Sequence, residues 1–180
     1  MREARKNGRI GSRQSVKTRA RATPLSPDAV IELAVRFVAH RDRTIAQVEQ
    51  FLTSRGISSL QAKQAIRRLS DLRYLNDDAY AQRWVERRLA ARPMGQERLR
   101  AELQAKGVAD RLADQVLADA FRTVNEDTLA HRVLKAAQRR GRRLTSTQVG
   151  RLLHQRGFTE ETIDHIMMKF RMNEERVHEE

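Results

Sequence analysis

Three glycines recur at nearly even spacing along the chain, and each lies in the same sequence neighbourhood. In every copy a leucine lies four residues before the glycine, a cation directly before it and an apolar residue directly after it; the glycines are Gly56, Gly107 and Gly157. Self-similarity with a period of about 50 residues is the signature of a repeat protein. The chain is therefore predicted to use one structural unit three times.

Each of these glycines is predicted to end a helix, because a helix commonly stops on a residue in the left-handed conformation, which glycine adopts without steric cost. Such a stop brings the residue four before the glycine against the residue after it. The predicted apolar pairs are Leu52 with Ile57, Leu103 with Val108, and Leu153 with Phe158. The three glycines are therefore assigned a structural role.

The predicted helix starts repeat as well. Thr44-x-x-Gln47 and Thr145-x-x-Gln148 are capping-box patterns at equivalent places, whereas Gly95 replaces the threonine in the middle copy. Nine helices in three groups are predicted from these signals. Their ranges are 26–40, 44–55 and 58–72, then 77–91, 95–106 and 109–123, then 126–140, 145–156 and 159–171.

Composition favours an all-α fold. The chain has only three prolines, with 39% hydrophobic, 4% aromatic and 33% charged residues, and its long runs of Ala, Leu, Arg, Glu and Gln favour helix. Such a lean apolar content suits repeats that each bury one stripe and pack mainly on their neighbours. The predicted divisions are a disordered basic arm at 1–25, repeats at 26–75, 76–124 and 125–172, and a frayed acidic tail at 173–180.

The net charge of +13 points toward polyanions, DNA or RNA first. Residues 1–24 hold eight cations and one acid, so +7 of the excess lies in the predicted arm. A solvated, disordered arm would account for this charge as well. The charge by itself therefore favours a nucleic-acid partner without specifying one.

No residue pattern indicates an active site. The chain has no cysteine, its five histidines form no H-x-x-x-H pair, and no glycine-rich phosphate loop or G-x-S-x-G motif occurs. We therefore expect no catalytic residue, no metal, no cofactor and no small-molecule substrate. No apolar run approaches the roughly 20 residues that span a bilayer, so neither a membrane partner nor a location outside the reducing cytoplasm is expected.

Some cations remain as candidates for contacting a partner or a phosphate. Arg83 and Arg87 lie four residues apart on the polar face of helix 77–91. Arg98, Glu102 and Lys106 follow one another at four-residue steps, and this row could equally form two intrahelical ion pairs. The densest cluster of cations, at residues 139–143, falls between two predicted helices. A solvated loop without a partner would explain this cluster equally well. The candidates are Arg83, Arg87, Arg98, Arg139, Arg140, Arg142 and Arg143.

The aromatic residues are predicted to serve the core rather than to stack on bases. They lie on helix faces that should be buried, and one pair, Tyr80 and Trp84, continues into an apolar stripe. The set is Tyr74, Tyr80, Trp84, Phe121 and Phe170.

The middle copy resembles a known family. The run Leu75-Asn76-Asp77-Asp78-x-Tyr80-Ala81-x-x-Trp84-Val85-x-x-Arg88 is similar to the L-D-D-x-x-F-A-x-x-Y-V-x-x-R signature of the RecX family. The following Gly95-x-x-Arg98-Leu99-x-x-Glu102-Leu103-x-x-Lys106-Gly107-Val108 resembles that family's G-P-x-R-[LI]-x-x-E-L-x-x-K-G-I stretch. Asn76 and Gln96 depart from the usual Asp and Pro, at positions that concern helix starts.

The resemblance implies three tandem three-helix units in an elongated, curved array. It also implies a regulator that binds the filament of the RecA recombinase on single-stranded DNA and inhibits filament extension, strand exchange and ATP hydrolysis. Single-stranded DNA would be contacted directly or through the filament. The alternative from the residues alone is an autonomous nucleic-acid-binding helical protein without a recombinase partner.

Overall fold

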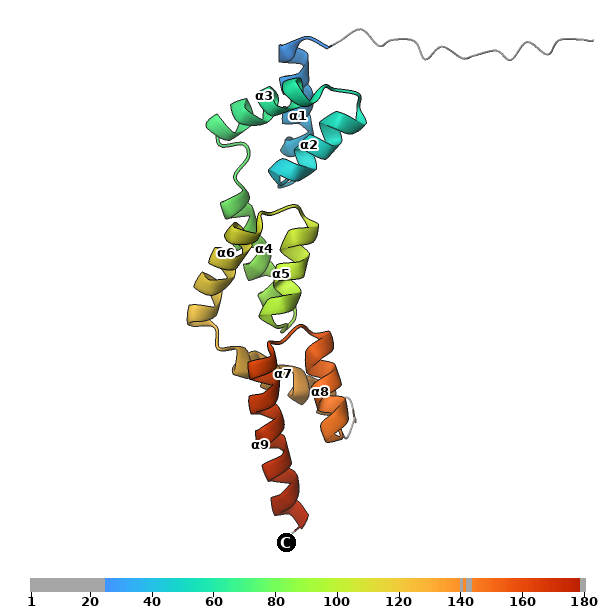
Figure 1. The fold of residues 1–180 in the computed structure, drawn as a ribbon, viewed down its shortest axis with the longest axis vertical. Helices are drawn as coiled ribbons and strands as arrows, with labels where there is room; N and C mark the ends of the chain where they lie inside the picture. The colour runs from blue at the N-terminus through green and yellow to red at the C-terminus, as the bar shows by residue number, and fades with distance from the viewer. Residues whose placement is uncertain (1–24, 140, 142–143, 179–180) are drawn as a thin grey trace, which may run out of the picture.

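The fold was analysed in a computed structural model, which describes residues 25–139, 141 and 144–178, with backbone only from 173 onward. The described chain is all-α, and its helices fall into three units stacked along one long axis (Figure 1). The first unit contains α1 (Pro27–Ala39), α2 (Ile45–Ser54) and α3 (Ser59–Asp71). The second contains α4 (Asp77–Ala91), α5 (Gln96–Ala105) and α6 (Asp110–Thr123), and the third contains α7 (Glu126–Gln138), α8 (Ser146–Gln155) and α9 (Glu160–His178).

The elongated array of three-helix units is confirmed, and eight of the helices lie within two residues of their predicted bounds. The exception is α9, which was predicted to end at residue 171 but continues to His178. The acidic tail predicted from residue 173 thus begins within this helix, and its fraying stays a prediction. The predicted arm at 1–24 lies outside the described residues. The predicted divisions at 75/76 and 124/125 fall in the connections before α4 and α7, and stay a proposal.

The three repeated glycines end α2, α5 and α8 as predicted. Gly56, Gly107 and Gly157 have φ angles of 79°, 78° and 70°, in the left-handed region. The N–H of the residue after each glycine donates to the carbonyl of the leucine four before it, at 3.2, 3.1 and 3.2 Å. The leucines are fully buried, so each stop also anchors its helix in the core. Capping boxes at Thr44 and Thr145 are confirmed too.

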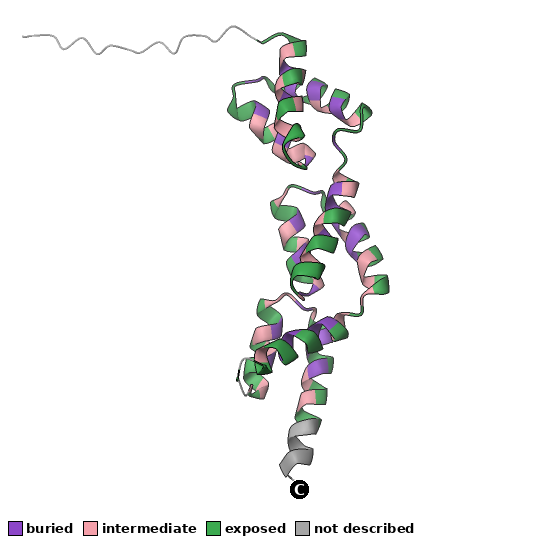
Figure 2. Cartoon of the chain, turned by 180° about the vertical axis from the view of Figure 1, so that it is seen from behind, coloured by how far each residue is buried: buried purple, intermediate pink, exposed green. Residues whose placement is uncertain are grey.

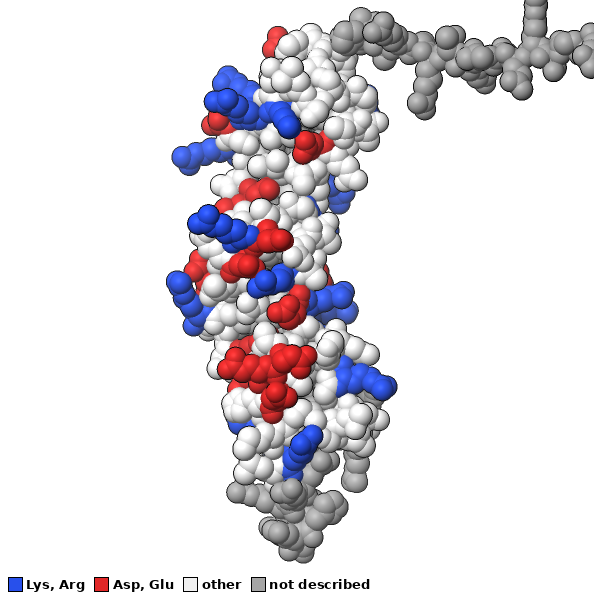
Figure 3. All heavy atoms as spheres, in the orientation of Figure 1, with Lys and Arg blue, Asp and Glu red and all other residues white. Residues whose placement is uncertain are grey.

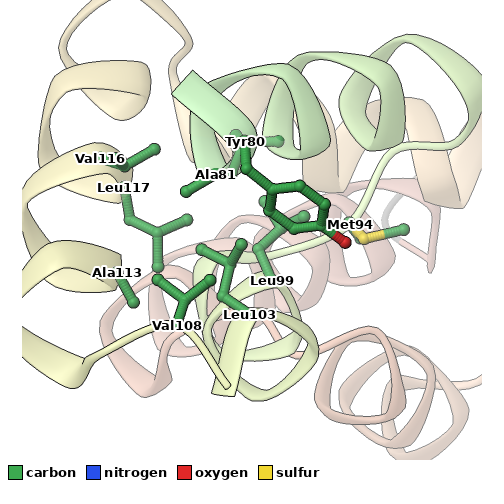
Figure 4. Packing of buried hydrophobic residues seen from close by; sticks show 10 residues of the cluster. Tyr80, Ala81, Met94, Leu99, Leu103, Val108, Ala113, Val116 and Leu117 are labelled. Atoms are coloured by element: carbon green, nitrogen blue, oxygen red, sulfur yellow. The ribbon is translucent and has the colours of Figure 1, made fainter. Parts of the chain in front are cut away.

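Each unit has its own hydrophobic core, which corrects the expectation of repeats that pack mainly on their neighbours. Buried stripes face inward within every unit (Figure 2). In the second unit, Tyr80 from α4, Leu103 from α5 and Leu117 from α6 converge on one centre (Figure 4). Helix pairs in extensive contact belong to the same unit throughout the described chain. The units are therefore small three-helix domains joined at narrow junctions.

At both junctions the second helices of adjacent units meet end to end, so that α8, α5 and α2 form one column (Figure 1). The Thr44 hydroxyl donates to the Lys106 carbonyl at 2.6 Å. The N–H groups of Gly95 and Glu97 donate to the Arg156 and Gly157 carbonyls, both at 3.0 Å. The positive end of one helix dipole thereby faces the negative end of the next, which is a favourable arrangement.

A carboxylate from the following unit completes each junction. The Ile45 N–H donates to Asp77 at 2.9 Å, and the Gln96 N–H donates to Glu126 at 2.8 Å. Each acid lies in the first turn of its own helix and also caps the second helix of the preceding unit. Burial raises the pKa of Asp77, and the Ile45 N–H partly offsets that rise. The junction is thus built by short polar contacts between helix ends.

The two junctions differ in their apolar content. Leu89 and Phe121 pack against both the second and the third core, so they bridge the second junction. The core of the first unit has no such bridge among the residues that the structure describes. The first junction is therefore the more polar of the two. No helix in the described part of the chain is long and apolar enough to cross a membrane.

Candidate functional site

A groove of about 550 Å³ opens at the first junction, where the segment after α1 and the start of α2 face α4 and the end of α5. Four cations line it together with the only tryptophan of the chain. We call this site the cation groove and define it by Arg41, Arg43, Trp84, Arg87 and Lys106. Both units line it, the first through residues 41–43 and α2 and the second through α4 and the end of α5, so the groove exists only when both units are docked.

Three of the four groove cations are held by aromatic rings or a backbone carbonyl. Lys106 Nζ lies 4.7 Å from the centre of the Trp84 ring, and the Arg43 guanidinium lies 4.3 Å from that of Phe37. Arg87 Nε donates to the Arg83 carbonyl at 3.2 Å. Cation–π contacts of this kind hold a charge in place without neutralising it.

None of the four groove cations has a carboxylate within 4.0 Å among the residues that the structure describes. Asp42 lines the groove but is paired with Arg83 at 2.9 Å. Arg43 is half-buried, and its Nε is buried without a hydrogen-bond partner. Burial and the neighbouring charge of Arg41 lower the pKa of Arg43. The groove therefore carries positive charge that the protein does not compensate.

Two other cations of the second unit share one carboxylate. Arg88 forms two hydrogen bonds to Glu102, one of them at 2.7 Å, and Arg98 lies 3.4 Å from the same carboxylate. Lys106 does not join this set but packs on Trp84. The predicted second ion pair between Glu102 and Lys106 is therefore absent, because Glu102 turns toward α4.

The predicted contact residues are spread along the molecule and do not form one site. Arg87 lines the cation groove, and Arg83 lies beside it through Asp42. Arg98 is exposed and paired at the other end of α5, and Arg139 is exposed at the end of α7. Arg140, Arg142 and Arg143 lie outside the described residues. Their role as contacts stays a prediction.

Sequence reasoning missed three groove cations, Arg41, Arg43 and Lys106. The first two stand in the short Arg41-Asp42-Arg43 segment between helices, the same kind of signal that drew attention to residues 139–143. Lys106 was assigned to Glu102 from its spacing alone. Finding the groove required knowing that the end of α1 and the end of α5 lie at one junction.

The aromatic predictions are confirmed for most of the set. Tyr80 is buried, and Trp84, Phe121 and Phe170 are half-buried. Tyr74 is the exception, with 59% of its surface exposed. It follows the turn at Arg73, whose φ of 59° redirects the chain so that Leu75 instead of Tyr74 enters the first core.

The same groove recurs at the second junction with different chemistry. It has a volume of about 410 Å³ and is lined by Arg92 and Arg156, the counterparts of Arg41 and Lys106. Val133 and Ala136 stand there in place of Trp84 and Arg87. Two cations replace four, and aliphatic side chains replace the indole. The repeat thus builds two grooves of one shape, of which only the first is strongly cationic.

Charge elsewhere is mixed in sign. Figure 3 shows basic and acidic side chains interspersed along one face, with a block of acidic atoms over the third unit. This block coincides with the first turns of α7 and α9, each of which begins with two acidic residues. No group of three or more histidines and carboxylates suited to hold a metal was found in the described segments.

The Arg88–Glu102 pair yields a prediction about stability. Burial alone would raise the pKa of Glu102, but the hydrogen bonds and charge of Arg88 outweigh it and lower the pKa below the ordinary 4.5. Glu102→Gln is expected to reduce the free energy of unfolding by about 1–2 kcal/mol at neutral pH. This loss is smaller than for a fully buried ion pair, because solvent screens the exposed part of Arg88.

This stabilisation should vanish as pH falls below about 4.5, since the folded protein holds the charged carboxylate more tightly than the unfolded chain does. Urea unfolding at a series of pH values measures it. Glu32→Gln, which breaks an exposed pair with Arg36, is the control and should cost at most a few tenths of a kcal/mol. A constant difference between Glu102→Gln and the parent at all pH values would contradict the ion pair.

Comparison with known proteins finds similarity to one family in sequence and in fold. Residues 76–117 match the family model described as RecX, second three-helix domain. The chain is 39% identical over 88 residues to the regulatory protein RecX of Lactobacillus delbrueckii subsp. bulgaricus, an alignment that covers 49% of this chain and 32% of that protein. It is 31% identical over 135 residues to that of Geobacillus kaustophilus, covering 72% of this chain and 49% of the relative. The chain thus spans a third to a half of the length of these two relatives.

Solved structures confirm the fold. The crystal structure of RecX from Lactobacillus salivarius superposes with a TM-score of 0.70 at 22% identity, covering 81% of this chain and 97% of that one. A second, described as a regulatory protein RecX, superposes with a TM-score of 0.69 at 19% identity, covering 78% of this chain and 72% of that one. The matched proteins are described as regulatory proteins and not as enzymes.

Proposed function

Because this chain resembles the RecX family of regulatory proteins in sequence and in fold, we propose that it is a member of that family and regulates the RecA recombinase. In this proposal it binds the RecA filament on single-stranded DNA and limits filament extension, ATP hydrolysis and strand exchange. Such an activity would act in DNA repair and recombination during the SOS response. The protein partner is RecA, and the nucleic acid is the single strand that the filament carries.

The observation that carries the proposal is the match of the second unit to the family model, since this unit holds the whole sequence signature. The shape of the molecule is a further support. Three units in a row present an elongated surface, as repeat proteins do when they bind extended partners. The cation groove lies on the first edge of the signature unit and suits a partner that contains phosphate.

The first test is RecA activity. We expect the protein to suppress DNA-dependent ATP hydrolysis by RecA at a substoichiometric ratio, because a regulator that stops filament growth at its end needs few molecules. The measurement is steady-state hydrolysis on circular single-stranded DNA over a titration of the protein. Undiminished hydrolysis at an equimolar ratio would exclude the proposal.

The alternative is a nucleic-acid-binding protein without a recombinase partner, and the unpaired groove cations favour it to the same degree. The two functions separate when hydrolysis is measured at several DNA concentrations. A protein that only covers DNA loses its effect when free DNA is in excess over RecA and protein together. A protein that binds the filament keeps its effect.

A further inference from the structure

We propose that the cation groove is a binding site for the phosphate groups of single-stranded DNA. The inference deepens the proposed function and rests on it for the choice of ligand, since the strand in the filament is single-stranded DNA. It assigns a specific site at the first junction, formed by Arg43, Trp84, Arg87 and Lys106, where one strand of nucleic acid would contact the protein.

Uncompensated charge is the first support. The groove lining holds four cations and one acid, and that acid is already paired with Arg83. A phosphodiester can accept hydrogen bonds from both arginine and lysine, and such charge-assisted bonds are among the strongest in proteins. The buried Arg43 Nε, which has no partner in the described chain, offers one donor for this purpose.

Preorganisation is the second support. The Trp84 ring holds Lys106, and the Phe37 ring holds Arg43. The Lys106 carbonyl is fixed by the Thr44 hydroxyl across the junction. Side chains that are already ordered lose little rotational freedom when a ligand binds. The groove cations are therefore better placed for an anion than the exposed lysines and arginines of the helix surfaces.

Size selects a single strand over a duplex. A groove of about 550 Å³ falls in the range of small-molecule sites, which leaves room for one or two nucleotides. A flexible single strand can lead its backbone into such a groove and place a base near an aromatic ring. A duplex is a stiff rod with its bases stacked inside. Its backbone could contact the rim but could not enter.

The second junction is an internal comparison. Its groove has the same position and a similar volume, but Val133 and Ala136 stand where the first has Trp84 and Arg87. The repeat architecture therefore produces a groove at each junction, with two cations in the second and four in the first. The indole and the two additional cations are thus a property of the first groove and not of the fold.

The test uses the full chain and the fluorescence of Trp84, which is the only tryptophan. An oligothymidylate of about 16 nucleotides, at the upper end of single-strand site sizes, is titrated at several salt concentrations. We expect saturable quenching of Trp84, because the strand enters the groove that the indole lines. A DNA that binds elsewhere would raise fluorescence anisotropy of a labelled strand without quenching Trp84, and this result would overturn the proposal.

The double variant Arg87→Gln/Lys106→Gln removes two groove cations and keeps the backbone contact of Lys106 with Thr44. Its affinity for the labelled strand should fall at least tenfold at low salt. The slope of log affinity against log salt should become shallower by about 1.4, the value for two phosphate contacts on a single strand. Circular dichroism and thermal melting establish that the variant is folded.

The matched control is Arg36→Gln/Arg122→Gln, which removes two exposed arginines that pair with acids on their own helices. It changes net charge equally and should leave both affinity and slope close to the parent. Equal losses in the two double variants would reduce the groove to part of a diffuse basic surface and refute the proposal.

Two further arms separate the possible outcomes. Tripolyphosphate that saturates Trp84 quenching without being displaced by the oligonucleotide would make the groove a small-anion site and refute the strand proposal. RecA hydrolysis is measured with the same variants. Quenching by DNA without any effect on RecA would sustain the groove and exclude the proposed function. Inhibition of RecA without quenching of Trp84 would sustain the proposed function and exclude the groove as the strand-binding site.

Discussion

The substitution Gly107→Val is expected to lower the free energy of unfolding by about 2–6 kcal/mol. A β-branched residue at a φ of 78° costs on the order of 1–3 kcal/mol in backbone strain. A Cβ at this position would also lie 2.3 Å from the Cβ of Ala46 in the first unit. Overpacking of this kind adds about 1–3 kcal/mol. The glycine thus serves both as a helix stop and as a junction contact, whereas sequence alone assigned it only the first role.

Gly56→Val is the matched control for this prediction. Its φ is 79°, but a Cβ there would meet no atom of the described residues within 4 Å. Urea unfolding followed by circular dichroism should show a smaller loss for Gly56→Val than for Gly107→Val, the difference being the contribution of the junction. Equal losses would show that the contact with Ala46 is relieved at no cost.

A double-mutant cycle tests the contact directly. Gly107→Ala should be partly rescued by Ala46→Gly, which removes the atom that the new Cβ would strike. The two substitutions should therefore be coupled, with an interaction free energy in the range of 0.5–3 kcal/mol that neighbouring residues typically show. Independent effects of the two substitutions would place Ala46 away from this glycine in solution.

The second large effect is expected at Gly95, where threonine should destabilise the protein by at least about 2 kcal/mol. The other two repeats carry Thr44 and Thr145 at this place, so the repeat pattern alone would favour a gain from a restored cap, typically about 1 kcal/mol. A Cβ on Gly95, however, would lie 2.1 Å from the Gly157 carbonyl oxygen and 2.3 Å from two backbone atoms of Phe158. Backbone atoms cannot rotate away, so units two and three would have to separate.

Separation would also lengthen two hydrogen bonds, those from Gly95 to the Arg156 carbonyl and from Glu97 to the Gly157 carbonyl. Each contributes on the order of 0.5–1.5 kcal/mol. The reverse exchange Thr145→Gly is the control, because the start of α8 contacts no other unit in the described part of the chain, and it should cost only a few tenths of a kcal/mol. A melting temperature that rises on Gly95→Thr would mean that the second junction is looser than the structure describes.

Both predictions concern contacts between small domains, and this explains their expected size. A three-helix unit of about 50 residues buries only a modest core and is marginal by itself. Stability in a linear array is the sum of what each unit contributes and what each interface adds. An interface made of a few hydrogen bonds between helix ends has little redundancy. One misplaced Cβ can therefore disrupt a whole junction.

The two junctions differ in chemistry, so the two ends of the array of units are not equivalent. The second junction is bridged by Leu89 and Phe121, which contact two cores, whereas the first is bounded by the polar cation groove. Apolar burial stabilises the second junction in proportion to the area it covers. A bound strand would supply the corresponding stabilisation at the first junction, because its phosphates would contact Arg43 of one unit and Lys106 of the next.

The sequence by itself determined the helix stops, the helix caps and most helix bounds, which depend on contacts within about ten residues. The glycine stops, the capping boxes and the bounds of α1 to α8 follow from hydrogen bonds between near neighbours in the chain, whose geometry is the same wherever the helix lies. The buried leucines at the helix stops followed from the same local rule. Only the end of α9 departed from it, because α9 continues without a glycine to stop it.

The tertiary structure alone decided how the helices meet. Thr44 bonds Lys106 across 62 positions, and Ile45 bonds Asp77 across 32. Such contacts depend on the positions of whole units, and residue type and spacing do not specify them. For this reason Lys106 was assigned to Glu102 in its own unit, while in the structure it packs on the Trp84 ring from α4. The local sequence pattern defined the repeated unit. The junctions between units, and the cation groove at the first junction, were determined by helix ends that only folding brings together.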